Sequence, residues 1–274
     1  MDLILAAHGT RRPGGVAMIG DLAAQVSALV GRTVQLAFVD VLGPTPSEVL
    51  SQAGATGRPA IVVPAFLSRG YHVRTDLPAH VAASGHPNVI VTPALGPGGE
   101  IARLVADQLA KSGWRPGDSV ILGAAGTLDR RARADLHTTA TLMSALTGSR
   151  VRLGFAATGD PHVHEAVDRA GARARRNGAR RVVVASYLLA DGLFQERLRT
   201  SGADLVSQPL GTHPGLARLI ANRFRRAMPP ALAPTTRHAS RRSSPHRRPH
   251  GRQVLPNSAA HKAVLASHAD AGDA

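Results

Sequence analysis

The sequence predicts an α/β protein with two tandem open parallel-sheet domains related by internal duplication, followed by a basic tail. The first observation is that short runs of aliphatic and β-branched residues alternate with amphipathic stretches. Such runs, without polar alternation, are typical of strands covered on both faces of a parallel sheet. The second is that residues 3–10 (LILAAHGT) recur as residues 120–127 (VILGAAGT), and residues 34–50 match residues 151–167 at the same spacing. Ungapped agreement over two separate segments favours duplication over chance.

Strands and helices alternate in each predicted half. The strands are expected at residues 3–7, 34–39, 60–63 and 89–92, and at residues 120–123, 151–155, 181–185 and 204–207. The helices are expected at residues 16–30, 46–53, 75–83 and 100–111, and at residues 130–146, 162–176 and 215–227. This alternation predicts two open, doubly wound sheets with right-handed crossovers.

Changes in composition set the expected boundaries. The segment WRPGD at residues 114–118 is typical of a linker, so we expect domains at residues 1–113 and 118–228. From residue 229 to 274 the chain is rich in Pro, Ala, Ser, Arg and His. We expect this tail to be disordered, because low hydrophobicity combined with charge cannot offset the entropy of ordering. A nucleic-acid contact, or adventitious metal binding by the histidines of the tail, is the alternative.

The composition is that of a soluble globular protein. With 274 residues, 43% hydrophobic content and a mean hydropathy near zero, the chain is long enough for two domains. The first apolar run is short and no basic region precedes it, so we expect a cytoplasmic protein without membrane contact. The absence of Cys excludes disulfides, thiolate metal sites and cysteine nucleophiles, which leaves His and carboxylate as metal ligands.

The net charge of +15 is divided between the body and the tail. Residues 228–274 hold seven Lys and Arg against two Asp, whereas the rest of the chain holds 26 basic and 16 acidic residues. A basic body attracts an acidic small molecule or a nucleic acid. Aromatic residues make up only 3% of the chain, which leaves little stacking surface for single-stranded nucleic acid and makes that partner the weaker expectation.

Three polar residues follow successive strands of the first half, namely His8, Asp40 and His72. Because ligands of open α/β sheets lie beyond the carboxyl ends of the strands, we expect these side chains to meet at one edge. Taken singly, each has a structural alternative: His8 as a turn residue, Asp40 as a cap and His72 as a surface histidine. Together, two imidazoles and a carboxylate suit Fe²⁺, Co²⁺ or Ni²⁺, and an imidazole can also accept a proton near neutral pH.

The second half has lost all three groups. The corresponding positions hold Ala125, Ala157 and, after an insertion in the second half, Phe194. Neighbours that shape the chain, such as Gly126 and Thr127, are retained. Retention of the scaffold without the polar groups favours a functional triad and predicts a single, asymmetric site for which the second half forms the opposite wall.

Two motifs carry a family resemblance. HGT at residues 8–10 after a buried strand, and PAFLSRGYHVRTDLP at residues 64–78, are similar to the paired motifs of sirohydrochlorin chelatases of the CbiX/SirB type, the class II chelatases. The resemblance extends over residues 1–227 and implies two chelatase-like α/β domains that enclose a tetrapyrrole cleft. The sequence departs from the familiar pattern at Thr10, where Ser is more usual, and at Arg69, where a small or apolar residue is common. Neither change removes a ligand.

The resemblance also implies roles for individual residues. His8 would be the proton acceptor and a metal ligand, and His72 the second metal ligand. Asp40 falls where some members have Glu, and its shorter side chain leaves both direct and water-mediated contact with the metal open. The wall against the macrocycle would consist of Leu67, Ser68, Arg69, Gly70 and Tyr71.

The activity implied by the resemblance is insertion of Fe²⁺ or Co²⁺, with Ni²⁺ a further option, into sirohydrochlorin for sirohaem or cobalamin synthesis. The metal is then a substrate, and no tightly bound cofactor is expected. Sirohydrochlorin or a related anionic tetrapyrrole is the expected partner, and the nearby arginines that would attract its carboxylates are Arg11, Arg12, Arg69 and Arg74. The chain is expected to be a monomer with pseudo-dimeric halves. The rival functions are a non-catalytic carrier of a tetrapyrrole or metal and a nucleic-acid-associated protein that binds through its tail.

Overall fold

The computed structural model describes residues 1–177 and 181–229, and Met1–Pro230 forms one compact unit. The predicted tail, apart from residue 229, lies outside the described residues. In chain order the elements are β1 (Asp2–Ala7), α1 (Pro13–Val30), β2 (Val34–Phe38), α2 (Pro46–Gly54), β3 (Ala60–Pro64), η1 (His72–Asp76), α3 (Leu77–Ala83), β4 (Val89–Val91), α4 (Gly99–Lys111), β5 (Ser119–Gly126), α5 (Arg130–Thr147), β6 (Arg152–Thr158), α6 (Val163–Asn177), β7 (Val182–Tyr187), α7 (Leu193–Arg199), β8 (Leu205–Val206), η2 (Leu210–Thr212) and α8 (Pro214–Ala227).

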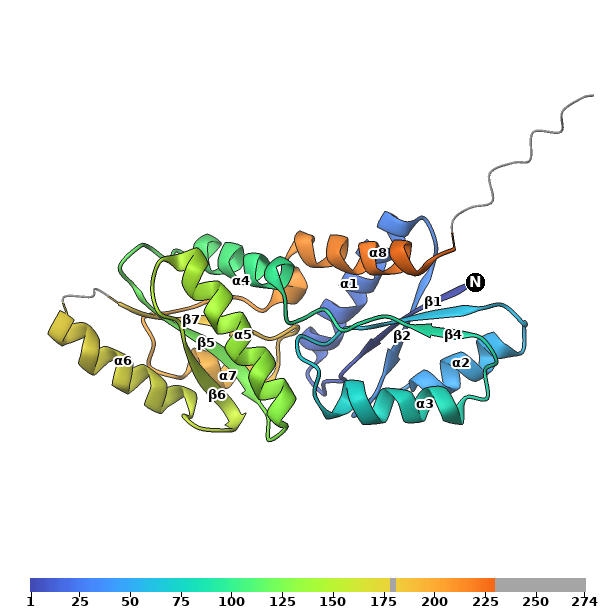
Figure 1. Ribbon diagram of the computed structural model, residues 1–274, viewed down its shortest axis with the longest axis horizontal. Helices are drawn as coiled ribbons and strands as arrows, with labels where there is room; N and C mark the ends of the chain where they lie inside the picture. The colour runs from blue at the N-terminus through green and yellow to red at the C-terminus, as the bar shows by residue number, and fades with distance from the viewer. Residues whose placement is uncertain (178–180, 230–274) are drawn as a thin grey trace, which may run out of the picture. The chain divides into compact units, whose positions relative to one another are not determined.

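The strands form two separate parallel sheets, each with four strands (Figure 1). Their orders are β2-β1-β3-β4 and β6-β5-β7-β8, so the second sheet repeats the topology of the first. The strands pair in parallel throughout, with β1 between β2 and β3 and with β5 between β6 and β7. The fold class predicted from the sequence is confirmed.

Small polar contacts are repeated along with the topology. In α1 the Ser27 hydroxyl accepts a hydrogen bond from the backbone N–H of Val34, with an N···O distance of 3.0 Å. In α5 the Ser144 hydroxyl accepts the corresponding bond from Val151 at 2.9 Å. Ser27 and Ser144 are separated by the same number of residues as the duplicated segments, so they are equivalent positions. The repeat therefore includes the contact that joins each helix to the next strand.

The core is continuous between the two sheets. β1 and β7 are buried along their whole length, as expected for central strands of a covered parallel sheet. One large apolar cluster joins residues of α1, α4, α5 and α8 to the inner faces of both sheets. A smaller cluster under α2 covers the outer face of the first sheet, and another under α6 covers that of the second.

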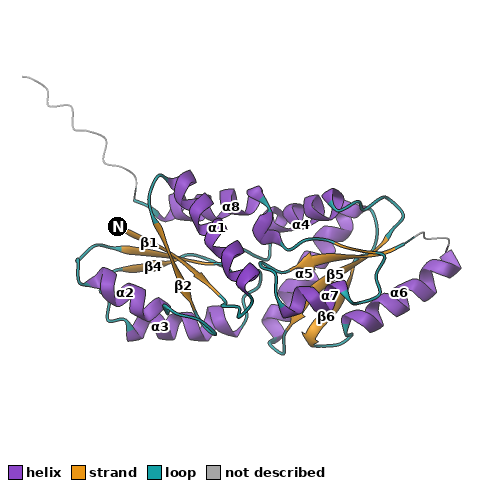
Figure 2. Cartoon of the chain, turned by 180° about the vertical axis from the view of Figure 1, so that it is seen from behind, coloured by secondary structure: helices purple, strands orange, loops and turns teal. Residues whose placement is uncertain are grey.

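The helices that follow the fourth strand of each half are exchanged (Figures 1 and 2). α4 follows β4 of the first sheet, but it contacts α5 and β7 of the second. α8 follows β8 of the second sheet, but it contacts α1 and β3 of the first. Order along the chain assigns α4 to the first half, whereas packing assigns it to the second sheet. The boundaries at residues 113 and 118 remain a prediction drawn from sequence order alone.

A buried histidine joins the exchanged helices. The Nδ1 atom of His213 accepts a hydrogen bond from the Gly215 N–H at 2.9 Å, which caps α8. Its Nε2 lies 2.5 Å from the Asp107 carboxylate on α4. Lys111 donates a further bond to Asp107, and together the hydrogen bonds from Lys111 and His213 hold the pKa of that carboxyl below its usual value. The helix cap therefore also serves as a link between the halves.

Two elements that contribute to the cavity described below differ from the sequence-based expectation. The helix expected from residue 75 is preceded by a π-helical turn, η1, which begins at His72. α7, a helix of seven residues, was not predicted. Both elements begin where the chain leaves a central strand, and both contribute residues to the cavity described below.

α1 is the one helix among the described residues whose length and apolar composition would allow it to cross a membrane. A core helix of a globular protein has the same properties. In this fold Ile19, Leu22 and Val26 of α1 are buried in the large apolar cluster. The face of α1 that carries them therefore lies inside the protein.

Candidate functional site

His8 follows directly on the central strand β1, at its carboxyl end. Its Nδ1 lies 2.7 Å from the carbonyl oxygen of Gly9. Because a carbonyl oxygen only accepts, Nδ1 carries the ring proton and Nε2 keeps its lone pair in the neutral imidazole. A Cβ on Gly9 would lie 2.3 Å from the Asp40 carbonyl oxygen, so a glycine is needed for the two loops to approach. The loop thus presents His8 with Nε2 available.

His72 begins the π-helical turn after β3. Its Nδ1 lies 2.6 Å from the Asp76 carboxylate, which accepts a hydrogen bond from Nδ1–H, so that in the neutral ring the lone pair lies on Nε2. The ring centroids of His72 and His8 lie 4.8 Å apart at an angle of 77°, and Phe66 stacks on His72 with a centroid distance of 6.0 Å. π-helical turns are frequent at functional sites because they re-aim side chains. Here the turn brings the second imidazole against the first.

Asp40 lies beside the pair but outside the central cavity. Its Oδ2 is 3.9 Å from His8 Nε2, and its side chain is 60% exposed. Its Oδ1 accepts the backbone N–H of Val41 at 2.7 Å. Val41 has a φ of 71°, a left-handed conformation that is rare for a β-branched residue and is found mainly where the surroundings impose it. The turn after β2 is therefore held in a strained form with the carboxylate near His8.

The three predicted residues do not form a closed metal cluster. Within residues 1–177 and 181–229, no three His, Asp or Glu side chains gather closely enough to hold a metal ion together. The geometry consists instead of two imidazoles in contact and one exposed carboxylate near His8. His162, just before α6, and His164, in its first turn, are both exposed.

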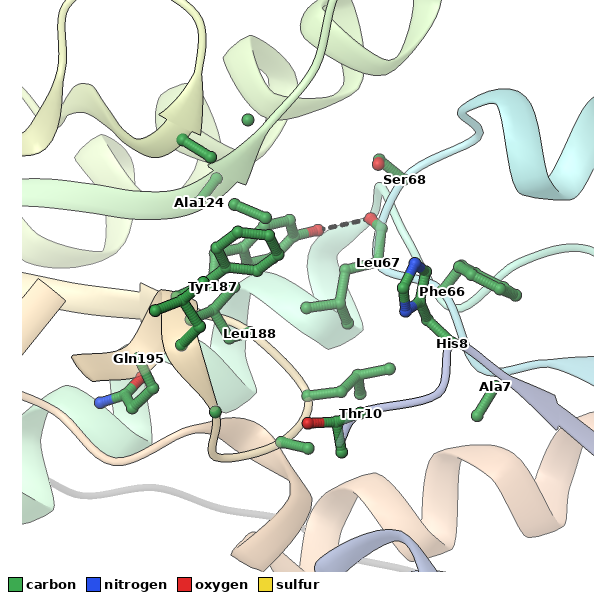
Figure 3. Close-up of a pocket in the computed structure, with 18 of the residues that line it drawn as sticks. Ala7, His8, Thr10, Phe66, Leu67, Ser68, Ala124, Tyr187, Leu188 and Gln195 are labelled. Atoms are coloured by element: carbon green, nitrogen blue, oxygen red, sulfur yellow. Dashed lines mark hydrogen bonds between the residues drawn. The ribbon is translucent and has the colours of Figure 1, made fainter. Parts of the chain in front are cut away.

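A cavity of about 470 Å³ opens beside the histidines (Figure 3). The first half contributes residues of the loops after β1 and β3, including His8, Thr10, Leu67 and His72. The second half contributes the carboxyl ends of β5 and β6, the loop after β7 and the start of α7. All three counterparts of the polar residues line it, namely Ala125, Ala157 and Phe194. The wall that faces the histidines is therefore mostly apolar.

Leu67 and Ser68 of the predicted macrocycle wall line this cavity. The buried Tyr187 hydroxyl donates a hydrogen bond to the Leu67 carbonyl oxygen at 2.7 Å, as Figure 3 shows. Burial raises the pKa of Tyr187 above its usual value, so the hydroxyl keeps the proton that this bond requires. Leu67 is thus held in place from the opposite half.

Arg69, Gly70 and Tyr71 are absent from the cavity lining. Arg69 forms a forked ion pair with the buried Asp135 of α5, with an Nη2···Oδ1 distance of 2.5 Å, and its backbone N–H donates to the same carboxylate. This pairing raises the pKa of Arg69. Tyr71 is 61% exposed. The assignment of these three residues to the substrate wall remains a prediction.

Three arginines near the site bridge the two halves. Besides the pair formed by Arg69, Arg12 contacts Glu196 of α7 at 2.6 Å, and Arg74 contacts Asp129 at 2.9 Å. Asp129 also caps α5. The backbone N–H of Ala132 donates a hydrogen bond to its carboxylate, and this bond is the main cause that holds the pKa of Asp129 below its usual value. These arginines are expected from the sequence to attract substrate, and their guanidinium groups also pair with acids of the second half.

Two residues of this arrangement were not assigned from the sequence. Asp76, which orients His72, lies four residues after it, and that spacing places side chains together on a helix. The spacing is therefore a signal that could have revealed Asp76. Tyr187 gave no such signal, because the carbonyl group that it contacts is more than a hundred residues away in the chain.

The profile of the CbiX family matches residues 2–112 and, a second time, residues 119–227. The chain belongs to the CbiX family. The resemblance stated from the two motifs is confirmed, and the double match agrees with the repeated fold.

Curated relatives of this family member include two archaeal proteins. A sirohydrochlorin cobaltochelatase of Methanopyrus kandleri is 32% identical over 78 residues, which are 28% of this chain and 54% of the relative. A sirohydrochlorin cobaltochelatase of Methanothermobacter thermautotrophicus is 26% identical over 130 residues, which are 40% of this chain and 90% of the relative. The match thus spans about half the length of the first relative and nearly all of the second.

Solved structures of similar fold include two of comparable length. SirB from Bacillus subtilis with Fe³⁺ aligns with a TM-score of 0.69 at 19% identity, over 82% of this chain and 95% of SirB. CbiX, described as the terminal enzyme for siroheme biosynthesis in denitrifying bacteria, aligns with a TM-score of 0.64 at 21% identity, over 84% of this chain and all of that one. These likenesses support the two-domain fold.

Proposed function

We propose that this protein is a chelatase that inserts Fe²⁺ or Co²⁺ into sirohydrochlorin. The observation that carries the proposal is the pair of contacting imidazoles, His8 and His72, whose Nδ1 atoms are both hydrogen-bonded to acceptors, so that in each neutral ring Nε2 carries the lone pair. Imidazole nitrogen is a good ligand for both metals. Membership of the CbiX family and two relatives named sirohydrochlorin cobaltochelatase support the substrate.

A site with only two imidazole ligands suits a metal ion that must be released from the protein to the macrocycle. Two protein ligands leave coordination positions open for water and then for the nitrogens of the macrocycle, whereas a closed set of four would retain the ion. The exposed Asp40 carboxylate near His8 would attract the cation and, in keeping with its distance, act through water. The metal in this proposal is a substrate, and no resident cofactor takes part.

Insertion also requires proton removal from the macrocycle. Each inner N–H that binds the metal loses its proton, so a divalent ion replaces two protons in the product. Once the metal has left His8 for the macrocycle, the freed Nε2 of His8 would accept the two displaced protons one after the other, and the electron pair of each N–H bond would stay on its macrocycle nitrogen as the bond to the metal. Asp40, 3.9 Å from Nε2 of His8, would stabilise the resulting imidazolium before each proton passes to solvent.

The second half would supply the opposite wall. Its apolar residues, among them Ala125 and Phe194, line the cavity and suit the flat faces of a macrocycle. Leu67 and Ser68 would form the near wall, with the Leu67 carbonyl group fixed by Tyr187. Arg11 is exposed, with no ion pair found within the described part of the chain, and would be available to a carboxylate at the rim.

An anaerobic absorbance assay with sirohydrochlorin and Co²⁺ or Fe²⁺ tests the proposal. The His8→Ala and His72→Ala variants are expected to lose insertion while keeping the thermal unfolding transition of the parent protein. His164→Ala is the matched control, since His164 is an exposed histidine outside the cavity. Normal rates in both active-site variants would contradict the assignment of the residues. Stoichiometric binding of sirohydrochlorin by the parent protein without turnover would instead establish the carrier function.

A further inference from the structure

A second cavity, of about 330 Å³, lies in the second half between α5, β6 and α6. Its floor contains the apolar residues Val151, Leu153 and Phe155 around the edge strand β6. Five arginines line it as well, namely Arg133, Arg150, Arg152, Arg169 and Arg173. His8 and His72 do not line it, so it is separate from the site proposed above.

The positive charge in this cavity is not neutralised within the described residues. Arg169 forms an ion pair with Glu165, and no ion pair is found there for the other four arginines. Asp160 is the acidic residue in the lining, and it is exposed. Burial, followed by the nearby charges of Arg173 and Arg150, lowers the pKa of Arg152. Like charges are thus held together at a cost in free energy that a bound anion would remove.

The first half shows that the fold does not need these arginines. In the register of the duplication their positions hold the uncharged residues Val16, Thr33, Gln35, Gln52 and Thr56. The edge strand β2 corresponds to β6 and remains an edge strand with Gln35 in place of Arg152. Charged residues can protect an edge strand from pairing with another chain. The edge strand β2, however, carries no charge at the position that corresponds to Arg152, so an edge strand of this fold does not require one there. The arginines therefore mark a property that belongs to the second half.

We infer that this arginine-lined cavity binds a small oxyanion with several negative groups, either carboxylates or phosphates. Guanidinium groups form forked hydrogen bonds with both kinds of oxyanion. Because several guanidinium groups surround the cavity, a ligand with several negative groups fits it better than a ligand with a single negative group. The apolar floor provides contact for the body of the ligand. The size falls at the lower end of the range typical of small-molecule pockets.

The charge also argues against two other occupants. The basic segment at residues 229–274 carries the same sign of charge as the cavity and would be repelled. A second copy of the chain that paired through β6 would place arginines opposite arginines, which destabilises strand pairing. A small anion remains the occupant that the residues favour.

Isothermal titration of the full chain with two probes, tripolyphosphate and citrate, tests this inference and distinguishes phosphate from carboxylate. The variant Arg150→Thr/Arg152→Gln/Arg173→Thr gives each position the residue of the first half, which that fold accommodates. The control Arg103→Gln/Arg218→Gln/Arg226→Gln removes the same charge from exposed positions of α4 and α8. We expect saturable binding of at least one probe by the parent and the control, and an affinity at least about tenfold lower in the cavity variant.

Equal affinity in the cavity variant and the control, or no saturable binding of either probe by the parent, would overturn the inference. Thermal unfolding without ligand provides a second readout, because removal of mutual repulsion is expected to leave the cavity variant at least as stable as the parent. If the unfolding temperature falls in the cavity variant but not in the control, the arginines stabilise the fold, and this result would also overturn the inference. Metal insertion is expected to be unchanged in both variants, so failure here is distinguishable from failure of the proposed chelatase activity.

Discussion

The two halves repeat the same strand order but carry different chemistry at equivalent positions. The first half holds His8 and His72 at the carboxyl ends of β1 and β3, where the second half holds Ala125 and Phe194. Conversely, the edge strand β6 carries Arg152 where β2 carries Gln35. Buried strand residues are constrained by packing, whereas residues at strand ends and edges can change with little effect on the core. Duplication has thus left one scaffold with two separate sets of polar groups.

The largest expected effect comes from the histidine that distinguishes the halves. His8→Ala should lower the rate of metal insertion by about 10²–10⁴-fold, the range typical for loss of a general base. His164→Ala, the same change at an exposed histidine of the second half outside the cavity, should leave the rate within a few-fold of the parent. Initial rates of absorbance change with sirohydrochlorin measure both. Comparable losses in the two variants would mean that the site is not asymmetric.

Asp76 sharpens the same comparison, because its counterpart in the second half is the buried Leu198. Asp76→Asn should weaken Co²⁺ binding by about 10–100-fold, since the amide can still accept from His72 but carries no charge to strengthen the imidazole as a ligand. Metal titration followed by cobalt absorbance measures the affinity, and the unfolding transition should stay in place. An unchanged affinity would assign Asp76 a purely structural role.

The contact between the halves is expected to depend on Asp135. Asp135→Asn should lower the free energy of unfolding by about 1–2 kcal/mol, because a buried carboxylate that accepts from Arg69 is replaced by a neutral group. Urea unfolding measures the difference. Asp21→Asn is the control, as Asp21 is an exposed acid of α1. If both variants lose the same stability, the effect is one of net charge and not of this ion pair.

Tyr187 should give the smallest effect, and one that depends on pH. At neutral pH, Tyr187→Phe should cost about 1 kcal/mol through loss of the bond to Leu67. The pKa of Tyr187 is raised by burial, so its contribution is complete below the ordinary tyrosine pKa of about 10 and is lost as the pH rises above it. The difference between parent and variant should then shrink by up to about 1.4 kcal/mol per pH unit. Urea unfolding at pH 8, 10 and 11 measures it, and a constant difference would contradict this account.

Local patterns were sufficient for the strands, the duplication and the proximity of His8, Asp40 and His72. Apolar runs identify buried strands because parallel sheets are covered on both faces. The convergence of residues from β1, β2 and β3 followed from the geometry of parallel sheets, in which carboxyl ends share one edge. By contrast, the sequence did not reveal that His72 lies on a π-helical turn, since the alternative turn geometry depends on contacts with the rest of the site.

The sequence by itself determined a duplicated α/β fold with His8, Asp40 and His72 in only one copy, because periodicity and residue identity are local properties. The tertiary structure alone decided which sheet α4 and α8 cover, which arginines join the halves and which residues face one another across the cavity. These features depend on contacts between residues far apart in the chain. The local sequence pattern is compatible with several arrangements of the helices around the two sheets. The packing of apolar helix faces and the pairing of buried charges select one of them.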